Sequence, residues 1–371
     1  MFAWIAHGMM ACMVHVAILF GGRSCEHEVS CVSAKSVLDH LSSHHDALLI
    51  GIGKNGAWYR QNLPSEASDA LKVVPDKANQ LSIQPSGGIV NAMGEKIPLD
   101  VVIPVLHGSY GEDGRVQGLL EIARVAYAGS GVLGSAVGMD KEIARKIWQQ
   151  EGLPVVPYRT LRVGTDRLED AKLPDKLFAE LGNPLFVKPA NAGSSIGVSR
   201  VINRSEMIEA LKTAAIYDRK ILVEKGVIGR EIECAVMGYT QPEAFVPGEI
   251  VPIGQHLFYD YDAKYIDPNG ALLHVPADLS ESILQSIQDI AVLAYRAVDA
   301  GGLARVDFLV DRKTDELLLN EINTMPGMTP ISLFPRMTAH GGLDFTAVID
   351  RLVQGALEEF AYREALSYSH S

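Results

Sequence analysis

The sequence predicts an α/β protein of several domains that begins with an open parallel sheet. With 371 residues, 47% of them hydrophobic, the chain is longer than one typical domain and can bury a large core. Apolar strand-like runs alternate with helical stretches near the N-terminus, a pattern typical of parallel sheets. Two apolar runs around a polar turn, in residues 303–323, predict a hairpin near the C-terminus.

Composition narrows the possible partners and compartment. The net charge of −12 argues against nucleic acid and anionic membranes as partners, because binding to phosphate needs basic patches. The four cysteines, at positions 12, 25, 31 and 234, have no CxxC spacing. They suit a reducing compartment. We therefore expect structural thiols and a cytoplasmic location.

Residues 1–13 are expected to form an N-terminal extension outside the first domain. Their apolar character leaves a signal peptide as an alternative. However, the segment has no Lys/Arg-rich start and is interrupted by His7, with His15 close behind. It also runs directly into a strand–turn–helix pattern. An upstream start codon is a further interpretation, and no other segment is long and apolar enough to span a bilayer.

The first predicted domain covers residues 14–136. Its apolar strand-like runs are residues 14–20, 47–52 and 101–106, with an amphipathic helical segment at residues 29–41. In open α/β sheets, ligands bind beyond the carboxyl ends of the strands. Gly21-Gly22 and His107-Gly108 fall at such ends.

The second and third predicted domains cover residues 137–235 and 236–371. Gly129-Ser130-Gly131 is a plausible hinge, and a helix is expected at residues 139–152, before Gly152 and Pro154 end it. The remaining expected elements are strands at 184–189 and 221–225 and helices at 205–215 and 280–300. The irregular stretch at residues 254–269, before the last of these helices, has the length of a functional lid.

The hairpin carries polar groups where its apolar faces end. One face of the outgoing strand holds Arg305, Asp307 and Leu309, and one face of the return strand holds Leu317, Leu319, Glu321 and Asn323. Carboxylates that face each other are costly unless a cation joins them. Oxygen ligands alone favour Mg²⁺ or Mn²⁺. The alternative is a polar face that is simply solvated.

The pattern Arg-Val-Asp-Phe, followed by Asn-Glu-Ile-Asn-Thr-Met-Pro-Gly, resembles the metal-binding hairpin of the ATP-grasp ligases. It is most similar to the D-alanine:D-alanine ligases of bacterial cell-wall synthesis, and the resemblance extends over about residues 15–350. It implies a three-domain ATP-grasp architecture, in which two α+β domains clasp ATP. It also implies ATP and D-alanine as substrates, two Mg²⁺ or Mn²⁺ ions on Asp307, Glu321 and Asn323, and a homodimer.

The loop after Lys188, with Gly193, Ser194, Ser195 and Gly197, could bring backbone N–H groups and hydroxyls close to phosphate. A Gly/Ser loop alone is more often only a turn. The resemblance makes it the phosphate-covering loop, with Lys188 and Ser195 on ATP and Ser194 against the substrate.

The resemblance also completes an ATP site from residues that would otherwise be interpreted as solvated charges. It implies Lys141 as a second phosphate ligand, Glu224, Lys225 and Val227 at adenine, and Glu231 at ribose.

Two motifs of the first domain are candidates for binding substrate. Glu26 and Glu28 open a helix, where acidic residues also simply favour the helix dipole. The resemblance places Glu26 on the amino group of the first D-alanine and leaves Glu28 structural. His107 is either a satisfied loop residue or a substrate contact, and the family's HGxxGEDG pattern implies contact.

The last candidates follow residue 250. Lys264 and Tyr265 could belong to a local aromatic cluster, but the resemblance assigns Lys264 to substrate binding and joins Tyr265 with Ser194 and Glu26 in one catalytic set. Ligases of the vancomycin-resistance type that use D-lactate lack this AKY segment or replace its Tyr, so D-alanine is the expected second substrate.

A Pro-Gly pair is an ordinary turn signal. In the family, however, Gly327 and Arg305 stabilise the tetrahedral oxyanion, while Ser332 and Leu333 bind the second substrate.

These assignments predict an enzyme that activates D-alanine as an acyl phosphate and joins it to a second D-alanine for peptidoglycan synthesis. The alternatives are a D-alanine:D-lactate ligase and a non-catalytic ATP-binding module on the same fold. A dehydrogenase is disfavoured because the chain lacks GxGxxG after its first strand.

Overall fold

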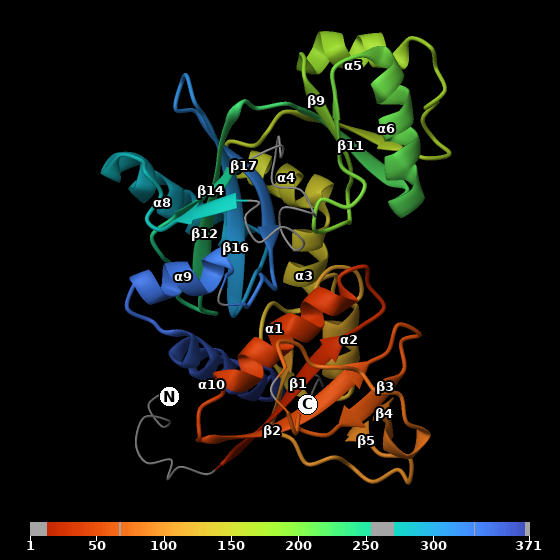
Figure 1. Cartoon of the computed structure of the whole chain (residues 1–371), viewed down its shortest axis with the longest axis vertical. Helices are drawn as coiled ribbons and strands as arrows, with labels where there is room; N and C mark the ends of the chain where they lie inside the picture. The colour runs from red at the N-terminus through yellow and green to blue at the C-terminus, as the bar shows by residue number, and fades with distance from the viewer. Residues whose placement is uncertain (1–12, 67, 254–270, 330, 368–371) are drawn as a thin grey trace.

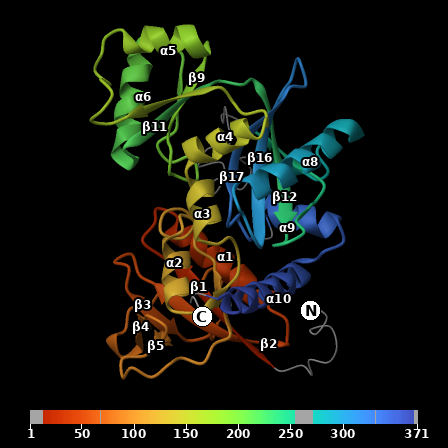
Figure 2. The same ribbon diagram turned by 180° about the vertical axis from the view of Figure 1, so that it is seen from behind.

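The computed structural model describes residues 13–66, 68–253, 271–329 and 331–367 and arranges them around three sheets (Figure 1). The first sheet forms one end of the molecule. The second and third sheets form two further lobes, which lie side by side at the other end. Helices α3 (Val132–Met139) and α4 (Lys141–Gln150) run from the first lobe towards the other two (Figure 2).

The first sheet has the strand order β5-β4-β3-β2-β1-β6-β7. Its strands are β1 (Val14–Gly21), β2 (His45–Ile52), β3 (Trp58–Gln61), β4 (Gln80–Gln84), β5 (Gly88–Val90), β6 (Val101–Pro104) and β7 (Ala126–Tyr127). Strand β1 is parallel to both β2 and β6, and residues 16–20 within it are fully buried. Such a continuous apolar run is typical of a strand covered on both faces. Helix α1 (His27–Asp39) covers one face and α2 (Arg115–Ile122) the other.

The predicted parallel sheet is confirmed for β2, β1, β6 and β7, but β3, β4 and β5 extend it as an antiparallel edge. All three strands are short, and β3 and β4 carry exposed polar side chains, with the short 3₁₀ helix η1 (Lys77–Asn79) beside them. The helix expected at 139–152 is also divided. Asp140 has an extended backbone, and its side chain accepts from the N–H of Ile143, so α4 begins at Lys141 and Met139 ends α3.

The second sheet has the order β10-β9-β11-β8, with antiparallel neighbours. Its strands are β8 (Tyr158–Arg162), β9 (Leu185–Pro189), β10 (Ser199–Val201) and β11 (Lys220–Lys225). Helices α5 (Leu173–Leu181) and α6 (Arg204–Tyr217) pack on it and form its core with Leu185, Val187 and Ile221. The predicted strand and helix positions here agree with the structure to within a few residues.

The third sheet has the order β15-β14-β12-β16-β17, with β13 paired to β12. Its strands are β12 (Gly229–Met237), β13 (Glu243–Ala244), β14 (Gly248–Pro252), β15 (Ala271–His274), β16 (Leu303–Asp311) and β17 (Leu317–Asn323). Helix α8 (Glu281–Ala297) packs on one face together with α4, whose fully buried Trp148 donates to the carbonyl of Ala294 at 3.0 Å. Helix α9 (Leu333–His340) lies on the other face. The division into three domains stays a prediction; its boundary at residues 235/236 lies inside β12.

The prediction that Leu317 and Leu319 share a face of strand β17 with Glu321 and Asn323 is wrong. Asp307 pairs with Glu321, but the next pair is Phe308 with Leu319, so Asn320 forms a β-bulge. The extra residue reverses the alternation. Leu317 and Leu319 therefore lie on the buried face with Phe308, opposite to Glu321.

The C-terminal helix α10 (Phe345–Glu364) connects the first and third lobes. Its buried residues Val348, Leu352 and Ala356 belong to one apolar cluster that includes Ile18 of β1 and Met237 of β12. At the end of the helix, Arg363 binds Glu121 at 2.6 Å and stacks over the ring of Tyr127. The two lobes consequently share a hydrophobic core.

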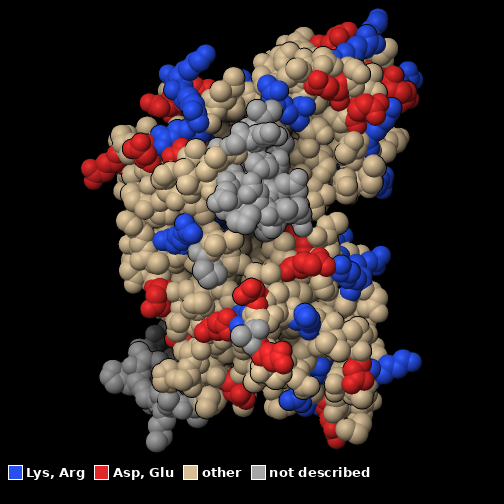
Figure 3. Space-filling model, in the orientation of Figure 1, with Lys and Arg blue, Asp and Glu red and all other residues tan. Residues whose placement is uncertain are grey.

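Charged side chains of both signs are mixed on the surface of the molecule. On the face in Figure 3, Lys and Arg side chains are interspersed with Asp and Glu. Among the described residues, no helix is both long and apolar enough to cross a membrane.

Candidate active site

Two adjoining cavities lie where the three sheets meet. The first, of about 400 Å³, is lined by α1, the loop after β6, the hairpin and the segment after it. The second, of about 540 Å³, lies between the second and third sheets. Both are lined by Lys141, Gly193, Ser194, Glu233 and Glu321. The two cavities thus meet at residues of the second and third predicted domains.

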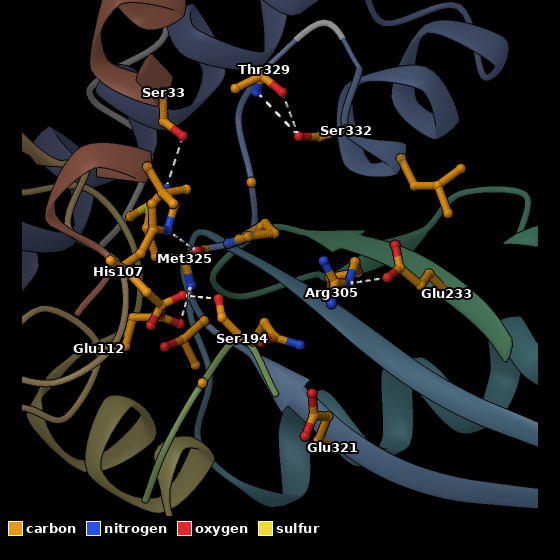
Figure 4. A pocket seen from close by; sticks show the side chains of 18 of the residues that line it. Ser33, His107, Glu112, Ser194, Glu233, Arg305, Glu321, Met325, Thr329 and Ser332 are labelled. Atoms are coloured by element: carbon orange, nitrogen blue, oxygen red, sulfur yellow. Dashed lines mark hydrogen bonds and ion pairs between the residues drawn. The ribbon is translucent and has the colours of Figure 1, made fainter. Parts of the chain in front are cut away.

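The Gly/Ser loop between β9 and β10 is built from left-handed backbone. Ser194, Ser195 and Gly197 have φ values of 48°, 57° and 71°. The loop is thus a series of turns, a backbone conformation that can present N–H groups to an anion. Ser194 donates its hydroxyl to Glu26, so the loop reaches across to the first lobe (Figure 4).

Glu26 immediately precedes α1 and is 5% exposed. Its carboxylate lies against two glycines. A Cβ at Gly108 would overlap an oxygen of Glu26, and one at Gly193 would lie 2.9 Å from it. Glycine is needed at both positions because the chain approaches the carboxylate so closely. The predicted pairing of Glu26 with Ser194 is present in the structure.

His107 is buried between the first lobe and the segment after the hairpin. Nε2 lies 2.9 Å from the hydroxyl of Ser33, and Nδ1 lies 3.0 Å from the carbonyl oxygen of Met325 (Figure 4). Burial lowers the pKa of His107 below its ordinary value, although Glu26 acts in the opposite direction. A neutral imidazole with Nδ1–H donating to Met325 fits these contacts.

Glu112 fixes the loop that carries His107. It accepts from the N–H of Gly108 at 2.8 Å and from the N–H of Met325 at 3.3 Å. Burial, reinforced by Glu26, raises the pKa of Glu112 to about 8. Glu112 therefore joins the first lobe to the segment after the hairpin. Its raised pKa favours the protonated carboxyl group near neutral pH.

The cation expected between the hairpin carboxylates is partly supplied by the protein. Arg305 donates from Nε and Nη2 to the two oxygens of Asp307, both at 2.7 Å, and its Nε lies 3.1 Å from Glu233. Asn323 also donates to Asp307, at 3.0 Å. Burial alone would lower the pKa of Arg305, but Asp307 and Glu233 raise it well above its ordinary value. The guanidinium is permanently charged.

Glu321 faces Asp307 across the strand pair and lies 3.3 Å from Nζ of Lys141. The Lys141 ammonium also donates to the carbonyl of Ala192 at 2.9 Å. These carboxylates are paired with cations, and together with Asn323 they offer only oxygen ligands, as Mg²⁺ prefers. The donor set therefore fits a divalent ion. Two carboxylates and an amide do not by themselves enclose one, and the described residues contain no group of three or more His, Cys, Asp or Glu side chains arranged for a metal.

Lys188 and Glu224 form a buried ion pair at 2.8 Å in the wall of the second cavity. Burial opposes the charge on both groups. It lowers the pKa of Lys188, whereas Arg145 and Lys188 outweigh it at Glu224 and hold the pKa of that carboxyl below its ordinary value. The Glu224 carboxylate is thus paired with both Lys188 and Arg145. The other predicted ATP-side residues line the same cavity, namely Ser195, Lys225, Val227 and Glu231.

The segment after the hairpin closes the first cavity. Gly327 lies close to Ser332, since a Cβ at Gly327 would be 2.8 Å from the Ser332 hydroxyl. That hydroxyl pairs with the hydroxyl of Thr329 at 2.8 Å. Leu333 begins α9 and is buried in the core while also lining the cavity. The predicted residues Lys264 and Tyr265 lie outside the described part of the chain.

The structure adds site residues that the sequence did not single out. They are Ser33, Glu112, Arg145, Glu233 and Asn320. Two of them had a usable signal: Glu112 lies inside the motif that contains His107, and Glu233 follows Glu231 on the same strand face. The other three are identified by contacts between segments far apart in sequence.

Known proteins match this chain over nearly its whole length. Residues 15–130 match the family model of the D-ala D-ala ligase N-terminus, and residues 147–354 match that of the D-ala D-ala ligase C-terminus. The chain is 43% identical over 360 residues to a D-alanine–D-alanine ligase of Treponema denticola, a match that covers 94% of this chain and 97% of the relative. It is also 43% identical over 368 residues to one of Oceanobacillus iheyensis, covering 96% and 98%.

Solved structures agree with the sequence relatives. The D-alanine–D-alanine ligase from Coxiella burnetii superposes with a TM-score of 0.82 at 34% identity, over 95% of this chain and 96% of that one. The VanG D-Ala:D-Ser ligase from Enterococcus faecalis superposes with a TM-score of 0.79 at 32% identity, over 93% and 100%. The predicted α/β fold of the ATP-grasp type is confirmed. By its sequence and its fold, the chain belongs to the D-alanine–D-alanine ligase family.

Proposed function

We propose that this protein joins two D-alanine molecules to D-alanyl-D-alanine, converts ATP to ADP and phosphate, and thereby supplies peptidoglycan synthesis. The observation that carries the proposal is the junction of the two cavities at Lys141, Ser194 and Glu321. A nucleotide in one cavity would direct its terminal phosphate at a small substrate in the other. Membership of the ligase family is consistent with this reaction.

In the first step, the carboxylate of one D-alanine attacks the terminal phosphorus of ATP, giving an acyl phosphate and ADP. Activation is needed because a free carboxylate and an ammonium do not condense usefully at neutral pH. Lys141, Lys188 and the N–H groups around Ser195 would hold the phosphates. The backbone of residues 224–227, together with Glu231, would hold adenosine. Mg²⁺ or Mn²⁺, as two ions bound by Asp307, Glu321 and Asn323, would offset the negative charge of the phosphates.

The first D-alanine would be oriented by the contacts of Glu26. The ammonium of this D-alanine would pair with the Glu26 carboxylate. Glu26, Ser194 and Tyr265 would act together as one catalytic set. His107, neutral and anchored to Ser33 and Met325, would lie near the carboxylate of the first substrate or the transferred phosphate, and Lys264, in the predicted lid at residues 254–269, would bind substrate. Closure of this lid would keep water from the acyl phosphate.

In the second step, the amine of the second D-alanine attacks the acyl carbon and phosphate leaves. The guanidinium of Arg305 and the N–H of Gly327 would stabilise the tetrahedral oxyanion, a contribution of roughly 3–4 kcal/mol per donor in other enzymes. Ser332 would bind the second carboxylate, and Leu333 would supply an apolar wall.

Product analysis tests the proposal directly. Purified protein with Mg-ATP is given D-alanine alone, D-alanine with D-lactate, D-alanine with D-serine, or no amino acid; phosphate release is measured and products are identified by mass. Phosphate release that depends on D-alanine, with dipeptide as the product, is expected. A mixed product in preference to the dipeptide would assign a depsipeptide or D-serine ligase. ATP binding without turnover would indicate that the protein is a non-catalytic ATP-binding module.

The assembly and location are part of the same proposal. A homodimer and a cytoplasmic location follow from the family resemblance and from the thiol pattern of the chain. Light scattering of the purified protein would distinguish a dimer from a monomer.

A further inference from the structure

Arg145 of α4 is fully buried and lines neither cavity. A buried guanidinium is costly unless it is paired and hydrogen-bonded. It lies 2.7 Å from Glu224 of β11, and it also contacts the bulge residue Asn320 of β17. One side chain therefore connects three elements from three separate parts of the chain.

The contact with Asn320 is made by two parallel donors. Nε and Nη2 of Arg145 donate to the Asn320 carbonyl oxygen at 3.1 and 2.8 Å, and Nη2 also donates to its side-chain oxygen at 3.1 Å. A bulge disrupts the regular pairing of its strand. The planar guanidinium provides the bulged carbonyl with two donors, which a single ammonium cannot reproduce in that geometry.

The bulge determines where Glu321 lies. Asn320 is the extra residue between the pairs Asp307–Glu321 and Phe308–Leu319. Without it, continuous alternation would place Glu321 on the same face as Leu319, which is fully buried in the core. Stabilising the bulge thus keeps Glu321 opposite Asp307 and beside Lys141.

Arg145 also organises the lysine of the second cavity. The Asn320 side-chain oxygen that accepts from Arg145 accepts from Lys188 as well, at 3.2 Å, and Glu224 pairs with both cations. Arg145, Lys141 and Lys188 thus face the carboxylates of Glu224 and Glu321.

We propose that Arg145 is a positioning residue of the nucleotide site, which holds the Asn320 bulge so that Glu321 points at the metal and phosphate position. The inference rests on the proposed function, because it concerns the metal that accompanies ATP. Arg145 itself touches neither ligand.

The test is ADP binding by calorimetry, with and without Mg²⁺, in the Arg145→Lys and Arg145→Gln variants. Lys keeps the charge beside Glu224, and Gln keeps an amide NH₂ group, but neither keeps the Nε/Nη2 fork on Asn320. We expect Mg²⁺ to strengthen ADP binding in the parent and this enhancement to fall by about 10- to 100-fold in both variants, as is usual when a residue that orients a metal ligand is changed. For Arg145→Lys, Mg²⁺-free ADP binding should change much less than this enhancement.

Arg162→Lys is the matched control, because Arg162 lies nearby and pairs with Glu142 rather than Asn320. It should leave the Mg²⁺ enhancement unchanged. An unchanged enhancement in a folded Arg145 variant would overturn the inference, as would loss of the fold in both variants, since Arg145 would then serve general stability. Failure of the ligase proposal is separate, because dipeptide formation is measured on the parent protein and ADP binding requires no D-alanine.

Discussion

At the residue scale, two lysines of the site are paired with carboxylates from other elements. Lys141 of α4 pairs with Glu321 of β17, and Lys188 of β9 pairs with Glu224 of β11. Removing one member of a buried pair leaves the other uncompensated. Substitutions here therefore alter the electrostatics of the site as well as the contact that is lost.

Glu321→Gln is expected to reduce dipeptide formation by at least about 100-fold, because a neutral amide binds a divalent ion more weakly than a carboxylate and metal-dependent charge stabilisation is lost. The fold should persist, since Glu321 is partly exposed and an amide has the same shape. Turnover and the thermal midpoint are measured together. The control, Glu316→Gln, lies at the exposed turn end of the same hairpin and should be fully active. Substantial activity in Glu321→Gln would remove this residue from the metal site.

Glu112→Gln should remove one component of the pH dependence of stability. The pKa of Glu112 is raised by burial from 4.5 to about 8, so its contribution to stability is fully present below pH 4.5 and is lost as pH rises through about 8. Between these values, the unfolding free energies of parent and variant should change relative to each other by up to about 1.4 kcal/mol per pH unit. Chemical denaturation at several pH values measures the two slopes. Parallel slopes would mean that Glu112 is ionised in the fold, and the exposed Glu95→Gln serves as control.

At the element scale, the distance between a helix and its neighbouring segment decides whether a position in the helix must be glycine. Helix α3 passes the turn after α8 so closely that a Cβ at Gly134 would overlap the backbone carbonyl of Asp299. In α2, a Cβ at Gly118 would meet only a methyl group of Val132 at 3.8 Å. Both are helix-interior glycines, but only Gly134 is required by packing.

Gly134→Ala is expected to destabilise the protein by about 1–3 kcal/mol, because backbone must move to admit the methyl group. Gly118→Ala, with the same chemical change, should be neutral or stabilising by up to about 1 kcal/mol, since alanine favours the helix. Urea denaturation of the two variants is the measurement. Equal effects would show that the approach of α3 to Asp299 relaxes at little cost.

At the scale of the whole molecule, the first and third lobes share one apolar cluster through α10. The site lies above this shared core, with Met325 bridging from the hairpin to the loop of His107. The relative placement of the lobes therefore determines whether the two cavities meet.

Leu352→Ala is expected to lower the unfolding free energy by about 2–5 kcal/mol, because the side chain is 2% exposed in the shared cluster. Calorimetry should show the transitions of the first and third lobes shifting together. Leu366→Ala, where the side chain is 45% exposed, should leave them unchanged. A shift confined to one of two separate transitions would contradict a shared core.

The sequence alone determined the features that depend on neighbouring residues. The burial of β1, the polar end of the hairpin, the Gly/Ser loop after Lys188 and the order of the motifs are local patterns, and the structure and the family matches agree with them. The residue roles assigned from the resemblance stay predictions. So do those of Lys264 and Tyr265, which lie outside the described residues.

Only the tertiary structure decided the features that depend on contacts distant in sequence. The bulge at Asn320 reversed the predicted face of Leu317 and Leu319, and a one-residue bulge has no periodic signature. Arg145 is 175 residues from Asn320, and His107 is 218 residues from Met325. Side-chain periodicity specifies which way a residue points along its own element, whereas burial, partners and pKa are set by elements that folding brings together.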